Sequence, residues 1–494
     1  MSASVSLIGA AILGVLLAGY VAQKYLPAPV PRIAGIDLGT TYSSIGVYHA
    51  VTGEAEIIVD LNGKASIPSV VAFTDNETVL VGYDAVEQAE TNAERTIYDA
   101  KRFIGKRFSR EGFDAEAARY PFKLQYNAGN VTFIVRINNE DQTFTPEQIG
   151  GYIISYLRRM AEQSLDVRIT KAVISVPAEF DDCQRNATKY AAALAGIEIL
   201  RVINEPTAAA LAYGLHKKDG VEYVLVVDLG GGTLDVSLLQ IQGGMFITTA
   251  MAGNNRLGGQ DFNERMESKL MAEIVETFGV TAISHDDRQA LRSAIERAKL
   301  NLTYHDATTL TLPLHSESLI EHTKSPKFAI NQNAGAAVAA ETASVSTTET
   351  NTAKRNTTSE TNERTTQATK GRTAKTTTAF QFVRTITRDE FDDWNDVLFA
   401  KILRPIRATL EDAGLVTRRD VDEIVLVGGS TRIPKVRRII RQFFGGKTLN
   451  TEVNPDLAVV TGVAVQAGVL GGGWPLQVSA VELPVKLKKI HVYD

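Results

Sequence analysis

Two stretches of the chain combine aspartate, glycine and threonine in an order that suits phosphate binding. Each is an apolar segment that ends in an aspartate, Asp37 or Asp228, and a turn containing glycine and threonine follows. Glycine lets the backbone approach a ligand closely, N–H groups in such a turn point at phosphate oxygens, and threonine hydroxyls add donors. The two carboxylates can hold a divalent cation, directly or through its water shell, because Mg²⁺ keeps several waters. The two stretches therefore predict a site that handles phosphate groups and a metal ion.

The elements that must position these residues are repeated along the chain. Ile33–Thr41 and Val224–Asp235 share one outline, and each leads into a second alternating strand, Ser44–Tyr48 or Asp235–Leu239. The two aspartates are about 190 residues apart, roughly one domain each, so the repeat predicts two similar halves that face one another. Either stretch alone could be a glycine-rich hairpin. Neither has the residue spacing of a Walker A loop or of a G-x-G-x-x-G turn.

A third glycine-rich turn fits the same scheme. The segment Asp422–Pro434 predicts a buried strand, a turn at Gly428 and Gly429, and the start of a helix with proline in its first turn. A nucleoside could pack on that turn, and Arg432 is available there for stacking or for charge.

The composition is that of a soluble globular protein. At 494 residues the chain is several times the usual domain length of about 150. Its 52 basic and 57 acidic residues give a net charge of −5, which does not indicate a nucleic-acid partner. The basic residues of segment 435–441 interleave with apolar ones at helical spacing, which predicts an amphipathic helix with a solvated face. Cys183 is the single cysteine, so no intrachain disulfide can form.

The N-terminus is apolar and carries no charge from Val5 to Ala22. Its length lies between that of a signal-peptide core and that of a membrane span, which needs about 20 residues. We expect residues 1–22 to be a signal peptide or a retained membrane anchor, since a proline-rich break follows at once; a helix of the folded core is the alternative. The expected location is the endoplasmic reticulum lumen or microsomes, with membrane association through this segment.

The sequence resembles the heat-shock protein 70 chaperones of the actin-like ATPase clan. The resemblance covers about residues 33–468 and includes the phosphate-binding stretches already described. Further matching segments are Tyr98–Gly105, Ile203–Ala210, Leu257–Phe262, Val427–Pro434 and Asn454–Asp456. Within the family, the chain is most similar to a member that consists of an ATPase core behind a hydrophobic N-terminus. The resemblance implies an α/β, actin-like ATPase fold with two duplicated RNase H-like lobes, residues 33–213 and 214–470, around a nucleotide cleft.

The resemblance also implies ATP/ADP and Mg²⁺ as ligands and a role for each matching position. Lys101 matches the lysine that orients the attacking water, and Glu205 matches a residue that helps to position this water. Asp37 and Asp228 match positions beside the Mg²⁺ shell, and Thr233 belongs with them to the catalytic set. The positions that match nucleotide-binding residues are Gly39, Thr40, Thr41, Tyr42, Gly230, Gly231, Gly232, Asp235, Gly258, Gly259, Glu296, Lys299, Thr303, Gly428, Gly429, Ser430, Arg432 and Asp456.

Two substitutions depart from the family pattern near the expected nucleoside. Leu300 stands where the family usually has an arginine, so an adenine would lose stacking on a guanidinium. Gln260 replaces a common glutamate beside the sugar, which removes a charge but keeps the capacity for hydrogen bonds. Weaker binding of ATP or ADP is the expected consequence.

Two larger departures concern whole segments. Residues 471–494 are expected to be a short tail without the family's interdomain linker and peptide-binding domain. In the family, J-domain partners engage that linker, so the resemblance does not extend to this contact. This tail is expected to contain one strand, Val478–Val485, with Lys486, Lys488 and Lys489 exposed beyond it. Residues 334–378 are a threonine-rich, low-complexity segment, which we expect to be a disordered surface insertion.

Three functions are compatible with these observations. The first is a peptide-independent ATP hydrolase linked to folding or processing of secretory proteins, with co-chaperones or nucleotide-exchange factors as partners and no peptide client of its own. The second is a small-molecule kinase of the same clan, against which the segment around Lys101 argues. The third is a nucleotide-binding scaffold or co-chaperone-like switch with negligible turnover.

Overall fold

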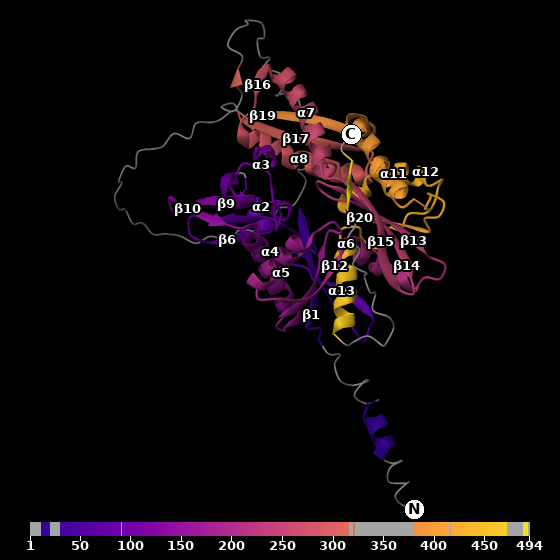
Figure 1. Cartoon of the computed structure of the whole chain (residues 1–494). Helices are drawn as coiled ribbons and strands as arrows, with labels where there is room; N and C mark the ends of the chain where they lie inside the picture. Colours follow the sequence, from indigo (N-terminus) through magenta and orange to yellow (C-terminus); the bar gives the residue numbers. More distant parts are fainter. Residues whose placement is uncertain are drawn as a thin grey trace, which may run out of the picture.

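Two mixed β-sheets stand at the centre of the molecule, one in each half of the chain (Figure 1). The computed structural model describes residues 11–19, 30–89, 91–315, 320–321, 379–414, 416–471 and 488–492. The expected insertion 334–378 and the expected strand Val478–Val485 lie outside the described residues.

The first sheet has the strand order β12-β11-β1-β2-β3. Strand β1 (Ile33–Leu38) is antiparallel to β2 (Tyr42–His49), which pairs in the same way with β3 (Glu54–Ile57). On its other side β1 is parallel to β11 (Lys171–Val176), which is parallel to β12 (Glu198–Asn204). The carboxyl ends of the three parallel strands therefore meet at one edge of the sheet.

The second sheet repeats this arrangement, with the strand order β20-β13-β14-β15-β21. Strand β13 (Tyr223–Leu229) is parallel to β20 (Glu423–Val427) and antiparallel to β14 (Leu234–Gln242), which continues into β15 (Met245–Asn254). The last strand, β21 (Ile490–His491), lies parallel to β15 at the edge. The duplication predicted from the two aspartate motifs is thus present as a repeated three-strand meander with a parallel neighbour.

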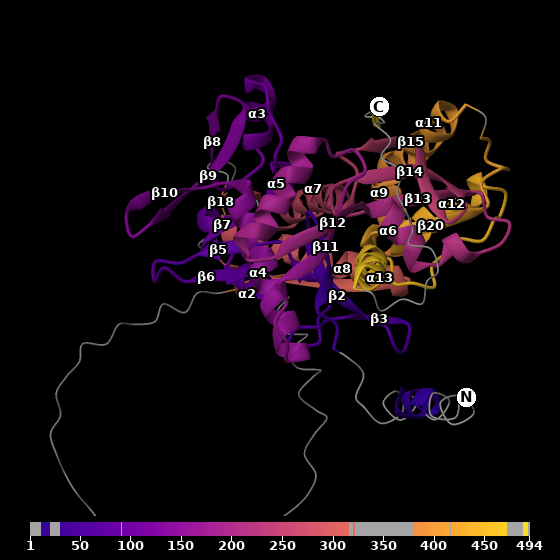
Figure 2. The same cartoon turned by 60° about the horizontal axis from the view of Figure 1, so that its bottom comes forward.

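Helices α6 (Glu205–Ala212) and α13 (Ala458–Leu470) pack between the two sheets (Figure 2). Their approach is so close that a Cβ added at Gly462 would lie 1.7 Å from the carbonyl oxygen of Ala208. Although α13 falls within the range expected for the second half, it packs against β1 and β2 as well. The two helices therefore join the halves through a shared apolar core.

Helix α4 (Pro146–Leu165) covers the first sheet together with α5 (Asp182–Leu194). A capping box begins α4: the Thr145 hydroxyl accepts from the Gln148 N–H, and the Gln148 side chain accepts from the Thr145 N–H. The apolar residues that recur along α4 at helical spacing face inward and are buried, namely Ile149, Ile153, Leu157 and Met160.

The second sheet is covered by α11 (Leu403–Asp412), and the apolar core of this half also contains α12 (Pro434–Phe443). The amphipathic helix predicted from the basic cluster is confirmed, because Val436 and Ile440 of α12 are buried. Helices α7 (Gly259–Phe278) and α8 (His285–Tyr304) pack on each other and on the antiparallel pair β17 (Ala307–His315) and β19 (Ala379–Thr387).

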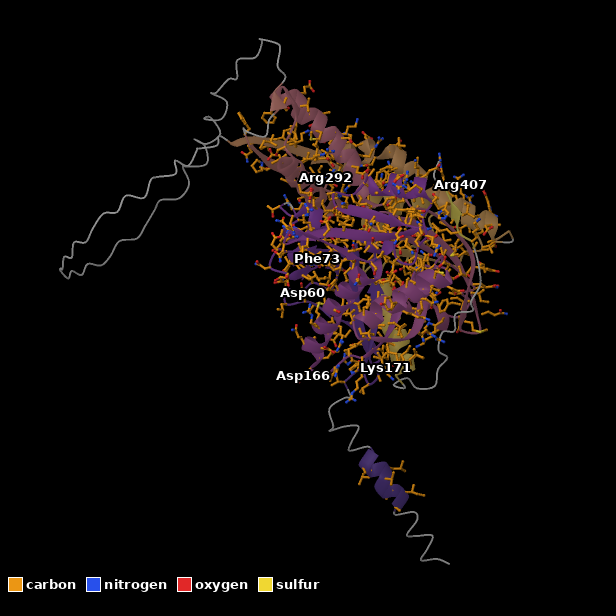
Figure 3. All side chains as sticks on the ribbon, turned by 60° about the vertical axis from the view of Figure 1, so that its left-hand side comes forward. Asp60, Phe73, Asp166, Lys171, Arg292 and Arg407 are labelled. Carbon is orange, nitrogen blue, oxygen red and sulfur yellow. The ribbon has the colours of Figure 1, made fainter. Side chains whose placement is uncertain are left out.

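Smaller elements complete both halves. In the first half, Phe73 stacks on Phe144 with ring centroids 4.3 Å apart and forms part of the core (Figure 3). The remaining strands are β4 (Ile67–Pro68), β5 (Val71–Phe73), β6 (Val79–Val81), β7 (Thr96–Ile97), β8 (Lys123–Asn127), β9 (Asn130–Ile137), β10 (Glu140–Phe144), β16 (Val280–Ala282) and β18 (Ile320–Glu321). The remaining helices are α2 (Tyr83–Glu87), α3 (Arg110–Ala117), α9 (Arg388–Trp394) and α10 (Asp396–Lys401).

Residues 11–19 form a helix that stands apart from the two halves (Figure 3). Its apolar side chains Ile12, Leu13, Val15, Leu16 and Leu17 are between 56% and 72% exposed. Among the described residues, none of the helices has the length and hydropathy needed to cross a bilayer.

Candidate functional site

The two predicted aspartates occupy equivalent positions at the ends of the central strands. Asp37 lies near the end of β1, where it faces Ser175 of β11, and the Ser175 hydroxyl donates a hydrogen bond of 2.8 Å to its carboxylate. Asp228 lies near the end of β13, directly opposite Asp235 of β14. In the first half the residue opposite Asp37 on β2 is the neutral Ser44, so this acidic pair has no equivalent there. Like charges on directly opposed residues repel each other.

The predicted lysine and glutamate form an ion pair beside these aspartates. Lys101 lies on the short 3-10 helix Ala100–Arg102, and Glu205 is the first residue of α6. The distance from Lys101 Nζ to Glu205 Oε1 is 2.6 Å, and the two side chains are only 7% and 18% exposed. Asp99 precedes the short helix with a left-handed backbone conformation of φ 59°, which is uncommon for a residue other than glycine.

The four charged groups influence one another. Desolvation acts to lower the pKa of Lys101, but the carboxylates of Glu205, Asp37 and Asp228 outweigh it and raise this pKa above its usual value. Desolvation raises the pKa of Asp228 well above its usual value, and the neighbouring Glu205, Asp235 and Asp37 raise it further. Lys101 therefore stays protonated and positively charged, whereas ionisation of Asp228 is made unfavourable by burial and by its acidic neighbours.

Glycines allow close contacts around the turn after β13, which was predicted to bind phosphate, both with the turn of the first half and with the neighbouring turn at Gly258. A Cβ added at Gly231 would lie 2.5 Å from the Thr41 hydroxyl oxygen, and one at Gly258 would lie 2.4 Å from the Gly232 nitrogen. The N–H of Gly259 donates to the Gly230 carbonyl at 3.0 Å. A Cβ at Gly258 would meet backbone atoms that cannot move aside, so glycine is required there, whereas one at Gly231 would require the Thr41 side chain to shift.

Serine side chains hold the first of these turns in place. The N–H of Gly39 donates to the Ser43 hydroxyl at 3.2 Å, and the Ser69 hydroxyl donates to the Gly39 carbonyl at 2.8 Å. Tyr42 follows Thr40 and Thr41 and is the first residue of β2. Desolvation, together with the carboxylates of Glu296 and Asp456, raises the pKa of Tyr42 to about 12, so Tyr42 of the first half is close to acidic groups of the second.

Helix α8 presents the polar residues that the sequence assigned to the nucleoside. Lys299 Nζ lies 2.7 Å from Glu296 Oε2 and donates to the Gly259 carbonyl at 3.1 Å, which ties α8 to the glycine turn. The Thr303 hydroxyl donates to the Lys299 carbonyl within the helix. Leu300, at the position of the expected arginine, is 53% exposed.

The third glycine turn closes next to Asp228. Gly428 has φ 81°, and a Cβ there would lie 2.7 Å from Asp228 Oδ1. The Ser430 hydroxyl donates to the Gly230 carbonyl at 2.9 Å, which connects this turn to the one after β13. Arg432 Nη2 lies 2.8 Å from Asp456 Oδ2, so the charge of Arg432 is paired. A Cβ at Gly429 would lie 2.7 Å from Asp456 Oδ1.

These residues fit a nucleotide that carries Mg²⁺. A Cβ at Gly428 would crowd the Asp228 carboxylate, and Gly39 lines a small cavity together with Lys101. In the part of the chain that the structure describes, no three His, Cys, Asp or Glu side chains are grouped so that they could ligate a metal by themselves. Carboxylates such as those of Asp37 and Asp228 are of the chemical kind that Mg²⁺ accepts as ligands, alongside phosphate oxygens and water.

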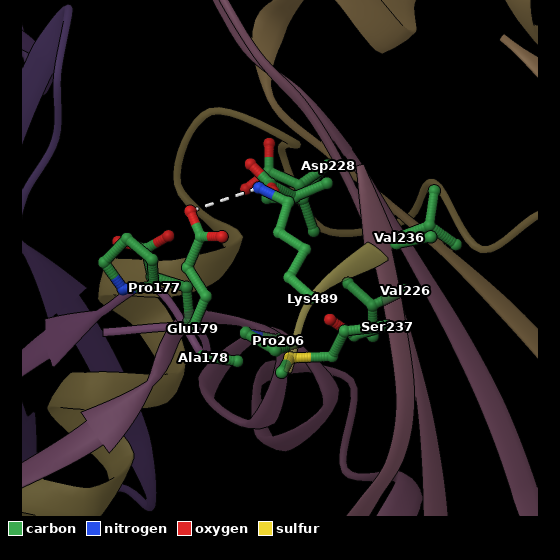
Figure 4. Close-up of a pocket in the computed structure, with 14 residues that line it drawn as sticks. Pro177, Ala178, Glu179, Pro206, Val226, Asp228, Val236, Ser237 and Lys489 are labelled. Carbon is green, nitrogen blue, oxygen red and sulfur yellow. Dashed lines mark ion pairs between the residues drawn. The ribbon is translucent and has the colours of Figure 1, made fainter. Parts of the chain in front are cut away.

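Sequence reasoning missed several residues that the fold brings to this place. Ser175 could have been found from the pairing of parallel strands, whose ends share one edge. No local pattern indicated Arg102, although a Cβ at Gly232 would lie 2.1 Å from its Nη2 atom. Lys489 was predicted to be exposed, and this prediction is wrong: its side chain is 4% exposed and pairs with Glu179 and Asp235 beside Asp228 (Figure 4).

Comparison with known proteins agrees with the geometry. The model of the family described as "Hsp70 protein" matches residues 33–332 and 331–484. Heat shock 70 kDa protein 13 of Homo sapiens is 50% identical over 487 residues, which is 98% of this chain and 98% of that protein. The protein of the same name from Rattus norvegicus is also 50% identical, again over 98% of both chains. A ribosome-associated molecular chaperone of Saccharomyces cerevisiae is 38% identical over 89% of this chain and 61% of its own length.

The family match agrees with the duplicated sheets and with the fold class expected from the sequence, an α/β, actin-like ATPase fold. Proteins of this family are ATPases that bind ATP or ADP with Mg²⁺. On the combined evidence of the match over most of the chain and the relatives of 50% identity, the protein belongs to the Hsp70 family.

Proposed function

We propose that this protein hydrolyses ATP to ADP and phosphate in a reaction that depends on Mg²⁺. The observation that carries the proposal is the ion pair of Lys101 with Glu205, 2.6 Å apart, close enough to Asp37 and Asp228 for both carboxylates to raise the pKa of Lys101. The family match supports ATPase activity in general terms. The assignment of these four residues to the reaction is ours.

Each of these groups has a task that suits its environment. The Lys101 ammonium, kept charged by three carboxylates, donates hydrogen bonds to the attacking water and to the oxygens of the γ-phosphate. Glu205 accepts a hydrogen bond from the same water and so fixes its direction of attack. Phosphoryl transfer depends mostly on such positioning and on stabilisation of charge.

The remaining predicted residues hold the nucleotide. The turns around Thr40 and Gly231 offer backbone N–H groups and hydroxyls to the phosphates, and Thr233 lies in the second of these turns. The α8 residues Glu296 and Lys299, with the turn at Gly428, are assigned to the nucleoside. Mg²⁺, when bound near Asp37 and Asp228, would neutralise negative charge on the phosphate oxygens.

We further propose that hydrolysis proceeds without a peptide client. All residues that we assign to the reaction lie in the described segments, around two sheets joined by α6 and α13. Co-chaperones or nucleotide-exchange factors are proposed as partners, as is general for the family. A small-molecule kinase would require an acceptor hydroxyl, and a scaffold would bind nucleotide without turnover.

Single-turnover hydrolysis of labelled ATP by the purified protein tests these proposals. Phosphate release that requires Mg²⁺, is the same with and without an unfolded peptide, and is lost in Lys101→Ala would support a peptide-independent ATPase. Release that requires an added sugar or other acceptor would indicate a kinase. Tight nucleotide binding with no release above that of Lys101→Ala would contradict the enzymatic proposal and leave a scaffold.

Residues 1–22 are proposed to direct the chain to the endoplasmic reticulum lumen. The exposed apolar side chains of the helix at residues 11–19 support this, since contact with water is unfavourable for them. Protease digestion of microsomes from expressing cells is the test. Protection that is lost with detergent is expected for the whole chain, whereas digestion without detergent would contradict the proposal.

A further inference from the structure

A short segment from the end of the described chain docks beside the proposed hydrolysis site. Strand β21 pairs in parallel with the edge of β15, with Ile490 opposite Ala252 and His491 opposite Gly253. The N–H of Val492 also donates to the Gly253 carbonyl at 2.9 Å. A two-residue strand is too short to be held by backbone pairing alone, because a few such bonds contribute little net free energy. A side-chain contact must supply the rest.

Lys489, immediately before β21, supplies that contact. Its ammonium pairs with the Asp235 carboxylate, lies 3.1 Å from Glu179 Oε1 and donates to Asn255 Oδ1 at 3.0 Å. These three acceptors match the three N–H groups of an ammonium. A Cβ added at Gly253 would lie 2.4 Å from Lys489 Cε, so the absence of a side chain there makes room for the lysine. Lys489 is therefore held specifically and is 4% exposed.

The two carboxylates that Lys489 joins come from different halves of the molecule. Glu179 follows β11 of the first sheet, and Asp235 is the second residue of β14 in the second sheet. Both line one pocket together with Glu205 and Asp228, and Figure 4 shows the Lys489 side chain reaching into it toward Glu179. The lysine thus connects the halves at the place where the proposed catalytic groups lie.

The charges explain why a cation is needed there. Asp228 and Asp235 are directly opposed across β13 and β14, whereas the equivalent partner of Asp37 in the first half is the neutral Ser44. Burying an ammonium is unfavourable unless it is paired with an opposite charge. The pairing of Lys489 with Asp235 offsets the desolvation of the ammonium and also the repulsion between Asp228 and Asp235. Lys489 consequently lowers the negative charge that a polyphosphate would meet in this pocket.

We propose that Lys489 is a positioning residue that latches the two halves together beside the hydrolysis site, so that docking of segment 488–492 and nucleotide binding strengthen each other. The inference rests on the proposed nucleotide function of the site. Because coupling between two sites is reciprocal, nucleotide must stabilise the docked segment by the same factor by which docking raises nucleotide affinity.

Three variants of the full chain test the latch. Lys489→Met removes the charge but keeps an unbranched stem, Lys489→Arg keeps the charge, and Lys488→Met changes the exposed neighbouring lysine as a matched control. Two quantities are measured: the dissociation constant of Mg²⁺–ADP by calorimetry, and amide hydrogen exchange of residues 490–492 with and without nucleotide. Neither measurement requires turnover.

The expected result separates Lys489 from its neighbour. Lys489→Met should raise the ADP dissociation constant about tenfold, within the usual range of such coupling, and should lose exchange protection at Val492. Lys489→Arg should retain most of both, and Lys488→Met should behave as the wild type. In the wild type, nucleotide should slow exchange at residues 490–492.

Glu179→Gln provides an independent test should Lys489→Met fail to fold. This variant leaves Lys489 paired with Asp235 but breaks the connection to the first half. Segment 488–492 should then remain protected in the absence of nucleotide, while the additional protection caused by nucleotide is lost.

The latch is overturned if Lys489→Met has the same ADP dissociation constant and the same hydrogen exchange at residues 490–492 as Lys488→Met. If Lys489→Met does not fold, the same comparison is made with Glu179→Gln. The latch is also overturned if nucleotide fails to bind or leaves the exchange of residues 490–492 unchanged in the wild type. A wild-type protein that binds ADP and shows the coupling, but releases no phosphate, would contradict the proposed hydrolysis and still support the latch.

Discussion

The ammonium of Lys101 lies 2.6 Å from the carboxylate of Glu205, although the two residues belong to a short 3-10 helix and to the first turn of α6. Both side chains are largely shielded from water, with exposures of 7% and 18%. An ion pair in such a place is sensitive to the loss of either partner, because the remaining charge is left without compensation. Replacing Lys101 would leave the Glu205 carboxylate without its partner.

Lys101→Ala should lower the rate of single-turnover ATP hydrolysis by at least about 100-fold, the usual effect of removing one donor that stabilises developing charge. The dissociation constant of ADP should change by less, since the glycine turns that approach the phosphates are untouched. Lys106→Ala alters an exposed lysine of the same segment and should keep the wild-type rate. A Lys101→Ala protein that still hydrolyses ATP within a few-fold of the wild type would rule out the proposed role.

Asp228→Asn should stabilise the protein free of nucleotide and Mg²⁺ at neutral pH. Desolvation and acidic neighbours raise the folded-state pKa of Asp228 well above 3.8. As pH rises from about 4 toward that pKa, the unfolded chain loses the Asp228 proton while the folded protein keeps it, so the stability of the fold falls. Asparagine removes this cost, so its stabilising effect is largest at neutral pH and disappears near pH 4. Thermal unfolding in EDTA measures this effect, and in a protein of this size each kcal/mol relieved raises the unfolding midpoint by about 1 °C.

The exposed Asp219→Asn serves as the control for this experiment and should show no comparable gain. Excess Mg²⁺ should narrow the difference between wild type and Asp228→Asn, since a cation near Asp228 stabilises only the carboxylate. An Asp228→Asn protein that is equally stable or less stable than the wild type at pH 7.5 contradicts the electrostatic account.

Gly258→Ala and Gly230→Ala should differ in stability although both change a glycine of the turns that are proposed to bind phosphate. A Cβ at Gly258 would lie 2.4 Å from the Gly232 nitrogen, which is backbone and cannot turn aside. At Gly230 the nearest contact would be Thr233 O at 4.0 Å. Urea unfolding should show a loss of about 1–3 kcal/mol for Gly258→Ala, as for other overpacked sites. Equal stability of the two variants would show that these turns do not pack as described.

Leu300→Arg should bind ADP more tightly than the wild type. Leu300 is 53% exposed on α8, one residue after Lys299, so a longer side chain can be accommodated. A guanidinium stacked on adenine contributes about 0.5–2 kcal/mol, which corresponds to roughly two- to thirtyfold in affinity. Leu300→Lys is the matched control, because it adds the charge without the planar group. Fluorescence titration with ADP distinguishes them, and equal affinities for both variants would argue against stacking.

Local features could be predicted from the sequence because their physical causes are local. The capping box at Thr145, the inward face of α4 and the amphipathic α12 all follow from residues within a few turns of one another. The aspartate–glycine motifs likewise predicted strands that end at Asp37 and Asp228, and their repetition indicated two halves. The roles of Lys101 and Glu205 came from resemblance to a family, since neither residue stands in a distinctive local pattern.

What the sequence by itself determined is the strand–turn motifs at Asp37, Asp228 and Gly428 and the amphipathic helix at residues 435–441, because hydrogen bonds and side-chain periodicity act between near neighbours. The tertiary structure alone decided which charges meet. The approach of Lys489 to Asp235 and Glu179 was not predicted, and Lys489 was expected to face water. Such contacts depend on how two sheets and the α6–α13 pair pack, and a lysine in a polar tail has the same local pattern whether its ammonium finds water or a buried carboxylate.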